Sequence, residues 1–243
     1  MAKPRIAIFD LACCEGCQLQ IVNMEDELLQ LLTLVDPVEW REAMSDQSDH
    51  YDIAIIEGSV TRPADEARVR DIRFRAQYVI ALGACAMQGG VNKLKNNFSL
   101  QEVKKEVYGY AANQAQFDTF RTKALGEVIK VDFEVPGCPI EASELAHVIK
   151  CLLTGQRPKL ADQPVCVECK MKANCCRYDY DEVCLGPITR AGCDARCPSN
   201  GFWCFGCRGI LPDANMDAAR EAAALHGKSF EDLQSKLELF GSE

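Results

Sequence analysis

The sequence predicts an α/β fold, in which a parallel sheet with helices on both faces is followed by a cysteine-rich, mostly irregular part. Over residues 1–155, continuous apolar runs alternate with helical patterns, as in buried parallel strands joined by crossover helices. Nine cysteines fall within residues 166–207, where little periodicity remains. The length of 243 residues suits one good-sized core with a smaller appendage.

Hydrophobic periodicity predicts the elements of the first part in order. Short apolar runs predict buried strands at residues 5–11, 51–57, 77–82 and 131–135. Amphipathic or polar helical patterns predict helices at residues 19–34, 64–76 and 141–153. Pro37 ends the first helix and Gly155 caps the last. The stretch GACAMQGG predicts a turn after the third strand, and residues 92–127 predict a mixture of helix and loop.

A change of composition near residue 155 predicts two domains, residues 1–155 and residues 156–243. Residues 166–207 cannot bury a normal core and need cross-links, which metal clusters can supply. Residues 217–225 and 230–239 have helical patterns and are expected to close the chain.

Charge and hydropathy exclude several classes of function. The formal net charge of −9 argues against nucleic acid or an anionic membrane surface as the main partner. No stretch of 18 apolar residues is present, so we expect no membrane span. The first residues, MAKPRIAIFD, lack the pattern of an export signal, and we therefore expect a cytoplasmic protein.

Fifteen cysteines are the outlying feature of the composition. An odd number cannot all pair as disulfides, and oxidised pairs are not expected in a reducing compartment. Cysteine at this density therefore predicts metal binding. Cys151 is an exception, because its helical, apolar surroundings favour core packing. The three histidines have polar or helical settings that favour solvated or structural roles.

Four cysteines follow the predicted strands at the point where each strand ends. Cys14 and Cys17 follow the first strand, Cys85 the third and Cys138 the fourth. The carboxyl ends of parallel strands meet at one edge of a sheet, where ligands of such folds bind. A single cysteine such as Cys85 is ordinarily a packing residue, but four at one edge predict a metal cluster.

The second part contains two further groups of cysteines. In the first group, Cys166 and Cys169 are spaced C-x2-C and are followed by Cys175, Cys176 and Cys184. The second group runs from Cys193 to Cys207 with the spacing C-x3-C-x6-C-x2-C. Sets of four thiolates bind either zinc or iron–sulfur clusters. Eight or nine thiolates in so short a segment, with Gly and Pro turns that let the backbone wrap closely, favour two four-iron clusters over zinc.

These motifs carry a resemblance to a known family. The set LACCEGCQLQ, IIEGSV, ALGACAMQGG and VPGCPIE resembles the small subunit of [NiFe] hydrogenases. The later set, CVECK and CLGPITRAGCDARCPSNGFWCFGC, resembles the cytoplasmic branch of that family, which includes the F420-non-reducing hydrogenases and the sulfhydrogenase delta subunit. The resemblance covers essentially the whole chain.

The resemblance implies a flavodoxin-like first domain and an electron-transfer role. It implies three [4Fe-4S] clusters, held as a proximal cluster by Cys14, Cys17, Cys85 and Cys138, a medial cluster by Cys193, Cys197, Cys204 and Cys207, and a distal cluster by Cys166, Cys169, Cys176 and Cys184. In the distal set Cys176 is preferred to Cys175, and Cys13 is expected to be a neighbour of the proximal cluster and not a ligand. The implied partners are a large subunit that carries the nickel–iron site and an electron-accepting iron–sulfur or flavoprotein subunit.

The sequence departs from the periplasmic members of that family in three respects. Those members have a histidine at the position of Cys166, a twin-arginine export signal and a three-iron medial cluster. Here Cys197 adds the fourth thiolate of the medial set. We expect a lower reduction potential from an all-cysteine [4Fe-4S] cluster, because cluster type and net charge set the potential.

Two other interpretations stay open. A subunit of a complex I-like quinone reductase has a similar first domain and uses two adjacent cysteines, which here would be Cys13 and Cys14. That family normally has one cluster, which leaves the nine later cysteines without a role. The second alternative is a structural zinc protein that scaffolds a complex. The sequence contains no phosphate-binding motif and no Ser/His/Asp set, so nothing in it indicates nucleotide or hydrolytic chemistry.

Overall fold

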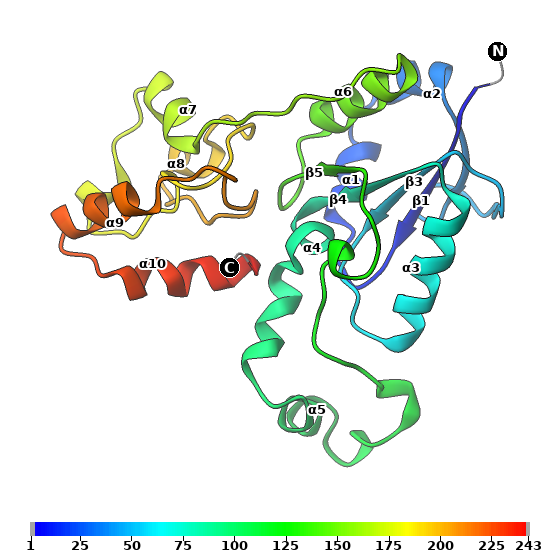
Figure 1. Cartoon of the computed structure of the whole chain (residues 1–243), viewed down its shortest axis with the longest axis horizontal. Helices are drawn as coiled ribbons and strands as arrows, with labels where there is room; N and C mark the ends of the chain where they lie inside the picture. Colours follow the sequence, from blue (N-terminus) through cyan, green and yellow to red (C-terminus); the bar gives the residue numbers. More distant parts are fainter. Residues whose placement is uncertain (1–2, 242–243) are drawn as a thin grey trace.

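The computed structural model describes residues 3–241, and it confirms the α/β prediction (Figure 1). All strand pairs of the five-stranded sheet are parallel. The strand order β2-β1-β3-β4-β5 is that of flavodoxin-like sheets, with a switch point between β1 and β3. The strands are β1 (Arg5–Asp10), β2 (Asp36–Trp40), β3 (Ile53–Glu57), β4 (Tyr78–Leu82) and β5 (Phe133–Val135).

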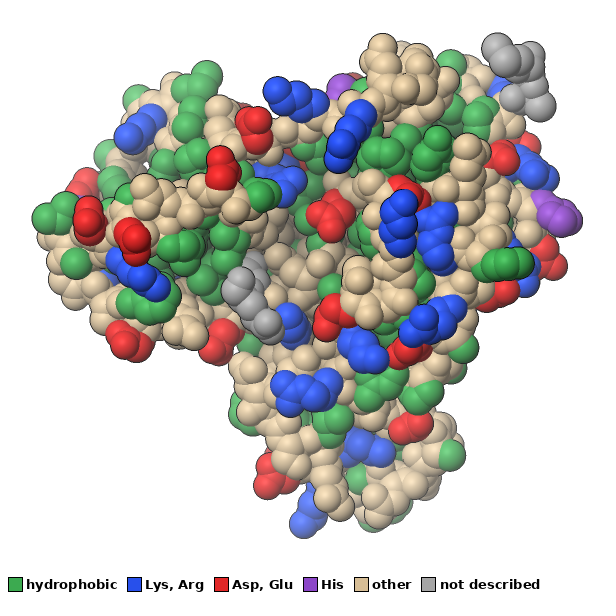
Figure 2. Space-filling view, in the orientation of Figure 1, with side chains coloured by type: hydrophobic (Ala, Val, Ile, Leu, Met, Phe, Trp, Pro, Cys, Tyr) green, Lys and Arg blue, Asp and Glu red, His purple; other side chains and the backbone are tan. Residues whose placement is uncertain are grey.

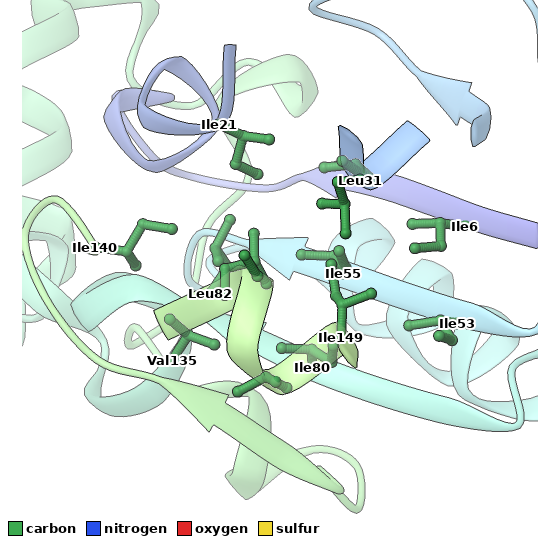
Figure 3. Close-up of a cluster of buried hydrophobic side chains, with 14 of the residues drawn as sticks. Ile6, Ile21, Leu31, Ile53, Ile55, Ile80, Leu82, Val135, Ile140 and Ile149 are labelled. Atoms are coloured by element: carbon green, nitrogen blue, oxygen red, sulfur yellow. The ribbon is translucent and has the colours of Figure 1, made fainter. Parts of the chain in front are cut away.

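Apolar cores lie on both faces of the sheet, which explains why its strands are continuous apolar runs. One face packs Ile55 and Ile80 against helices α1 (Gly16–Val22), α2 (Asp26–Leu34) and α6 (Ala142–Leu153), as Figure 3 shows. The other face packs alternate strand residues, such as Ala54 and Ile56, against α3 (Pro63–Arg75). Cys151 is buried on α6, as its apolar neighbours predict.

The predicted helix over residues 19–34 is wrong in one respect, because it is two helices. Between α1 and α2 the chain turns at Glu25, whose φ is +50°. Strand β2 was also missed by the sequence patterns, since DPVEW is short and contains proline and two acidic residues. Pro37 is accommodated there because β2 is an edge strand, where a missing N–H costs no ladder hydrogen bond.

The stretch GACAMQGG is not a simple turn. Its first six residues form helix α4 (Gly83–Gln88), and a 3-10 helix, η1 (Gly90–Asn97), follows after Gly89 with φ +92°. Helix α5 (Leu100–Tyr108) and two 3-10 turns, η2 (Gly109–Ala111) and η3 (Ala115–Phe117), then form a projection away from the sheet (Figure 1). We call residues 98–121 the arm. The chain returns to the sheet through η4 (Leu125–Glu127).

The arm differs from the rest of the sheet domain in its exposure. Helix α5 has no buried residue, and Phe98, Val107 and Tyr110 are exposed. Its internal packing centres on stacked rings of Tyr108 and Phe117, 4.0 Å apart between centroids. Over the visible face of the molecule, charges of both signs are mixed (Figure 2).

The cysteine-rich part has a small core of its own, contrary to the expectation from its composition. After α6 an extended segment leads to α7 (Val165–Met171), the turn η5 (Arg177–Tyr180) and α8 (Arg196–Ser199). The closing helices supply the missing apolar surface, because Ala219, Ala223 and Leu233 pack against Leu185 and Ile188. These helices are α9 (Met216–Leu225) and α10 (Phe230–Leu237), followed by η6 (Glu238–Phe240).

The end of the described chain returns to the base of the arm. Asn97 donates a hydrogen bond to Glu238, at 3.3 Å, and Lys93 donates one to the carbonyl of Gly241, at 3.2 Å. Within residues 3–241 no helix is both long and apolar enough to cross a bilayer.

Candidate metal centres

The four cysteines predicted at the strand ends converge beside the switch point of the sheet. Cys14 and Cys17 flank the start of α1, Cys85 lies on α4, and Cys138 lies in the loop between β5 and α6. Cys85 and Cys138 interact electrostatically with Cys14, and Cys17 interacts with Cys138. Burial raises the pKa of Cys85 to about 12, so an iron or zinc ion must displace a proton to bind there.

Glycines allow the backbone to approach these sulfurs. A Cβ atom at Gly83 would collide with the sulfur of Cys17, and one at Gly90 would lie 2.7 Å from the sulfur of Cys85. Both glycines have positive φ, which suits glycine. The space around the four thiols is therefore shaped by residues without side chains, as a bulky inorganic group requires.

A buried carboxylate orients the helix that carries Cys17. Glu57, at the end of β3 and 1% exposed, accepts hydrogen bonds from the backbone N–H groups of Cys17 and Gln18, both at 3.1 Å. It thereby caps the first turn of α1 in place of an N-cap side chain. The sequence patterns did not single out Glu57, although a charged residue that ends a wholly apolar strand is a signal of such a role.

Cys13 is set apart from the other thiols of its loop. Its thiol lies 3.6 Å from the carbonyl oxygen of Leu11 and donates to it. It is near enough to Cys85 for an electrostatic interaction, and burial raises the pKa of Cys13 to about 12.

A second group of thiols forms around α7. Cys166 interacts electrostatically with Cys184, Cys169 and Cys176. Cys184 accepts a hydrogen bond from the backbone N–H of Cys204, at 3.2 Å. Burial raises the pKa of Cys166 to about 12. As at the first group, a glycine stands close by, because a Cβ at Gly186 would lie 3.2 Å from the sulfur of Cys166 and 3.5 Å from that of Cys184.

Cys175 has a different partner from Cys176. A hydrogen bond with Cys175 raises the pKa of Tyr180, and both side chains are exposed. Cys176, by contrast, interacts with Cys166 and Cys184.

The third group consists of Cys193, Cys197, Cys204 and Cys207. Cys207 interacts electrostatically with Cys193 and Cys197, and Cys204 interacts with Cys207. Glu168, which stands between the cysteines of the C-x2-C pair, accepts hydrogen bonds from the N–H groups of Gly192 and Ala195 at 2.7 and 2.9 Å. One carboxylate thus joins the second group to the loop of the third, a contact that the sequence patterns did not predict.

The three groups adjoin one another in a row. Arg208, next to Cys207 of the third group, donates a hydrogen bond of 2.9 Å to the carbonyl of Pro136, two residues before Cys138 of the first group, and the backbone of Cys138 opposes the effect of burial on the pKa of Cys207. Cys204 lies beside Cys184 of the second group. The spatial order is therefore the first, the third and then the second group along the sequence. All fifteen cysteines are free thiols.

A single ion needs a different arrangement of thiols from a four-iron cluster. A zinc site places its sulfurs about 2.3 Å from one point. Among residues 3–241, no group of three or more Cys, His, Asp or Glu side chains is arranged to hold a single metal ion. Groups of four thiols beside glycines fit the chemistry of four-iron clusters, in which each thiolate binds a separate iron.

Comparison with known proteins relates both parts of the chain to redox enzymes. Residues 14–152 match the family model described as NADH ubiquinone oxidoreductase, 20 Kd subunit. The sulfhydrogenase 2 delta subunit of Pyrococcus furiosus is 36% identical over 214 residues, which cover 87% of this chain and 89% of that protein. A vhu-type F420-non-reducing hydrogenase subunit of Methanocaldococcus jannaschii is 31% identical over 90% of this chain and 86% of that protein.

Solved structures agree with the fold. A chain of an NAD+-reducing [NiFe]-hydrogenase in the H2-reduced state superposes with a TM-score of 0.59 at 26% identity, over 65% of this chain and 96% of that chain. The Ni-Fe-Se hydrogenase of Desulfomicrobium baculatum superposes with a TM-score of 0.59 over 90% of this chain and 98% of that chain. At 17% identity, the latter similarity concerns the fold alone.

Proposed function

The chain belongs to the family of [NiFe] hydrogenase small subunits, and on that premise we propose that it carries electrons between a large subunit and a downstream acceptor. It is an oxidoreductase subunit. In this proposal the large subunit oxidises H2 to two protons and two electrons, and no bond chemistry takes place on this chain.

The row of three thiol groups is the observation that carries the proposal. We propose a proximal [4Fe-4S] cluster on Cys14, Cys17, Cys85 and Cys138, a medial one on Cys193, Cys197, Cys204 and Cys207, and a distal one on Cys166, Cys169, Cys176 and Cys184. The contacts between Cys138 and Cys207 and between Cys204 and Cys184 support a continuous route through the chain. When bound, each cluster would take up and release one electron at a time.

The residues of this chain hold and tune that route. Thiolates supply the ligands, glycines leave space for the inorganic sulfides, and Glu57 and Glu168 fix the loops that bear the ligands. The N–H of Cys204 donates a hydrogen bond to the sulfur of Cys184, which favours the thiolate of Cys184 and would raise the potential of a cluster bound there. An EPR redox titration that showed a high-potential [3Fe-4S] signal would contradict the all-cysteine medial set.

Paired variants test the ligands that have a second cysteine beside them in the sequence. We expect Cys14→Ser and Cys176→Ser each to lose one cluster, measured as iron, acid-labile sulfide and EPR spin concentration. Their adjacent controls, Cys13→Ser and Cys175→Ser, should keep all clusters, since these thiols face Leu11 and Tyr180 instead. Equal losses in both members of a pair would overturn the assignment.

The arm supports contact with a partner chain. Its apolar side chains are exposed, and an exposed apolar surface of this kind marks protein contacts. The 3-10 helix η1, which leads into the arm, is joined to the loop of the first thiol group, because Asn92 donates a hydrogen bond of 2.7 Å to the carbonyl of Ala12, two residues before Cys14. We therefore propose that the large subunit covers this side, and that an iron–sulfur or flavoprotein subunit takes electrons near the distal set. The density of free thiols supports a reducing, cytoplasmic location.

The deciding experiment is anaerobic purification of the chain with its natural partners, followed by metal and sulfide analysis. We expect about twelve iron atoms and equal acid-labile sulfide from the three four-iron clusters of this chain, in addition to the iron and sulfide that the partner subunits contain. Co-purification with a nickel-containing subunit and H2-dependent reduction of the clusters should accompany them. A colourless protein that contains zinc and no labile sulfide would establish the structural zinc alternative, and about four iron atoms, those of a single four-iron cluster, would favour the quinone reductase alternative.

A further inference from the structure

Arg208 is a buried cation at the junction of the two parts of the chain. It directly follows Cys207, and its side chain is 1% exposed. Each guanidinium nitrogen has a partner: Nε donates to the carbonyl of Ala191 at 2.8 Å, Nη1 to that of Pro136 at 2.9 Å, and Nη2 to both carboxylate oxygens of Glu144 at 2.7 and 2.8 Å. The side chain is thus fixed in one position.

Those acceptors lie on the segments that carry adjoining thiol groups. Pro136 stands two residues before Cys138, and Ala191 stands two residues before Cys193. Glu144 belongs to α6, on the sheet side of the junction. A single planar group therefore holds the loop of the first thiol group against the loop of the third, with three donors in a fixed geometry.

The surrounding backbone leaves room for this guanidinium. Gly192 has φ +113°, and a Cβ atom at that position would collide with both Nη2 of Arg208 and the carboxylate of Glu144. A buried ion pair is often replaceable by apolar residues without loss of stability, so a purely stabilising role explains such a site poorly. The guanidinium is shielded from water and lies against the backbone of Ala191, two residues before Cys193, so that its positive charge acts on the loop of the third group.

We propose that Arg208 is a positioning residue for electron transfer between the Cys138 loop and the Cys193–Cys207 loop: its hydrogen bonds fix the two loops in one relation, and its charge favours an added electron on the Cys193 side. This inference rests on the proposed function.

Three variants of the holoprotein separate charge from geometry. Arg208→Met removes both the charge and the hydrogen bonds, and should lower the potential of the medial cluster. Arg208→Lys keeps the charge and loses the fork of donors, so that it should keep the potential and weaken the magnetic coupling between the reduced proximal and medial clusters. Glu144→Gln removes the negative charge beside Arg208 and should raise the medial potential. EPR-monitored potentiometry measures all three.

Arg196→Met provides the matched control. Arg196 also joins the cysteine-rich part to the sheet part, through Glu141 at 2.7 Å, but both side chains are partly exposed and water screens their charges. We expect wild-type coupling from this variant and a smaller change of the medial potential than in Arg208→Met, because Arg196 lies beside Cys197 but is half exposed.

Opposite shifts in Arg208→Met and Glu144→Gln distinguish an electrostatic role from a merely structural one. Unchanged potential and coupling in Arg208→Met, with full iron and sulfide, would overturn the inference while leaving the proposed function intact. If Arg208→Met fails to retain its clusters, the Lys and Gln variants decide, and wild-type values in both would again overturn it. Wild-type protein without labile sulfide would instead refute the proposed function.

Discussion

The sheet part and the cysteine-rich part of this molecule obtain their shape in different ways. The sheet part has apolar cores on both faces, and β3 is buried along its whole length. The cysteine-rich part contains helices of seven and four residues, too short to be stable in isolation, and its small core depends on the closing helices. From this difference we expect the sheet part to fold by burying apolar surface, and the cysteine-rich part to need bound metal as well.

The largest expected effect follows from removing the metal. We expect iron chelation under anaerobic, reducing conditions to abolish hydrogen-exchange protection over residues 166–207 while the sheet keeps its protection. The reason is that metal binding supplies folding free energy where the core is small. Reconstitution with iron and sulfide should restore protection. Equal protection of both parts without metal would remove the distinction.

A cavity in the sheet part should have the opposite result, with stability lost in the sheet and not in the cysteine-rich part. Ile55→Ala removes a side chain that is 1% exposed and lies between α6 and the strands (Figure 3), so it should cost about 2–5 kcal/mol of the unfolding free energy of the sheet part. Chemical denaturation followed by hydrogen exchange measures this cost. Leu29→Ala, at a side chain that is 63% exposed, is the control and should cost far less.

A variant of Glu168 tests how much the cysteine-rich part depends on polar contacts where apolar packing is sparse. Glu168→Gln leaves one of the two N–H groups of Gly192 and Ala195 without its acceptor, which should cost about 1–3 kcal/mol. We expect lower iron occupancy of the third thiol group and unchanged occupancy of the first, measured by EPR spin quantification. Glu141→Gln breaks a partly exposed ion pair and serves as its comparison. A loss confined to the first group would contradict the prediction.

The smallest expected effect is the pH dependence of stability that Asp65 contributes in the first turn of α3. Burial alone would raise the pKa of Asp65, but hydrogen bonds from Arg62 and Thr61 outweigh it, and the net pKa is lowered. Because the folded pKa lies below the unfolded one, the contribution of Asp65 to stability is present above the unfolded value and is lost as the pH falls through the folded value. Hydrogen exchange at the start of α3 should follow this dependence, and Asp65→Asn should remove it.

Hydrophobic periodicity and position along the strands predicted much of the sheet part, whereas residue chemistry predicted less of the irregular segments. The strand runs around Ile55 and Ile80 are unbroken apolar segments, so they and the convergence of Cys14, Cys85 and Cys138 could be read from the sequence. Strand β2 could not, because an edge strand with Pro37 buries little surface and needs no apolar run.

The contacts that arrange the second part could not be predicted for a different reason. Glu168 and Arg208 act through backbone groups far along the chain, and no local pattern specifies such partners. Their positions beside cysteines were the only available signal. The domain boundary near residue 155 stays a prediction, since the return of α10 and η6 to η1 gives the two parts a second connection.

That second connection has a consequence for biogenesis. Gly241 approaches the backbone of α4 so closely that a Cβ atom there would collide with the carbonyl of Gln88. The segment that makes this contact is synthesised after the sheet part and the cysteine-rich loops that it encloses, and proteins fold from the N-terminal side during synthesis. We therefore expect the cysteine-rich loops to stay open to metal delivery until the closing helices have been synthesised and η6 packs against α4 and η1.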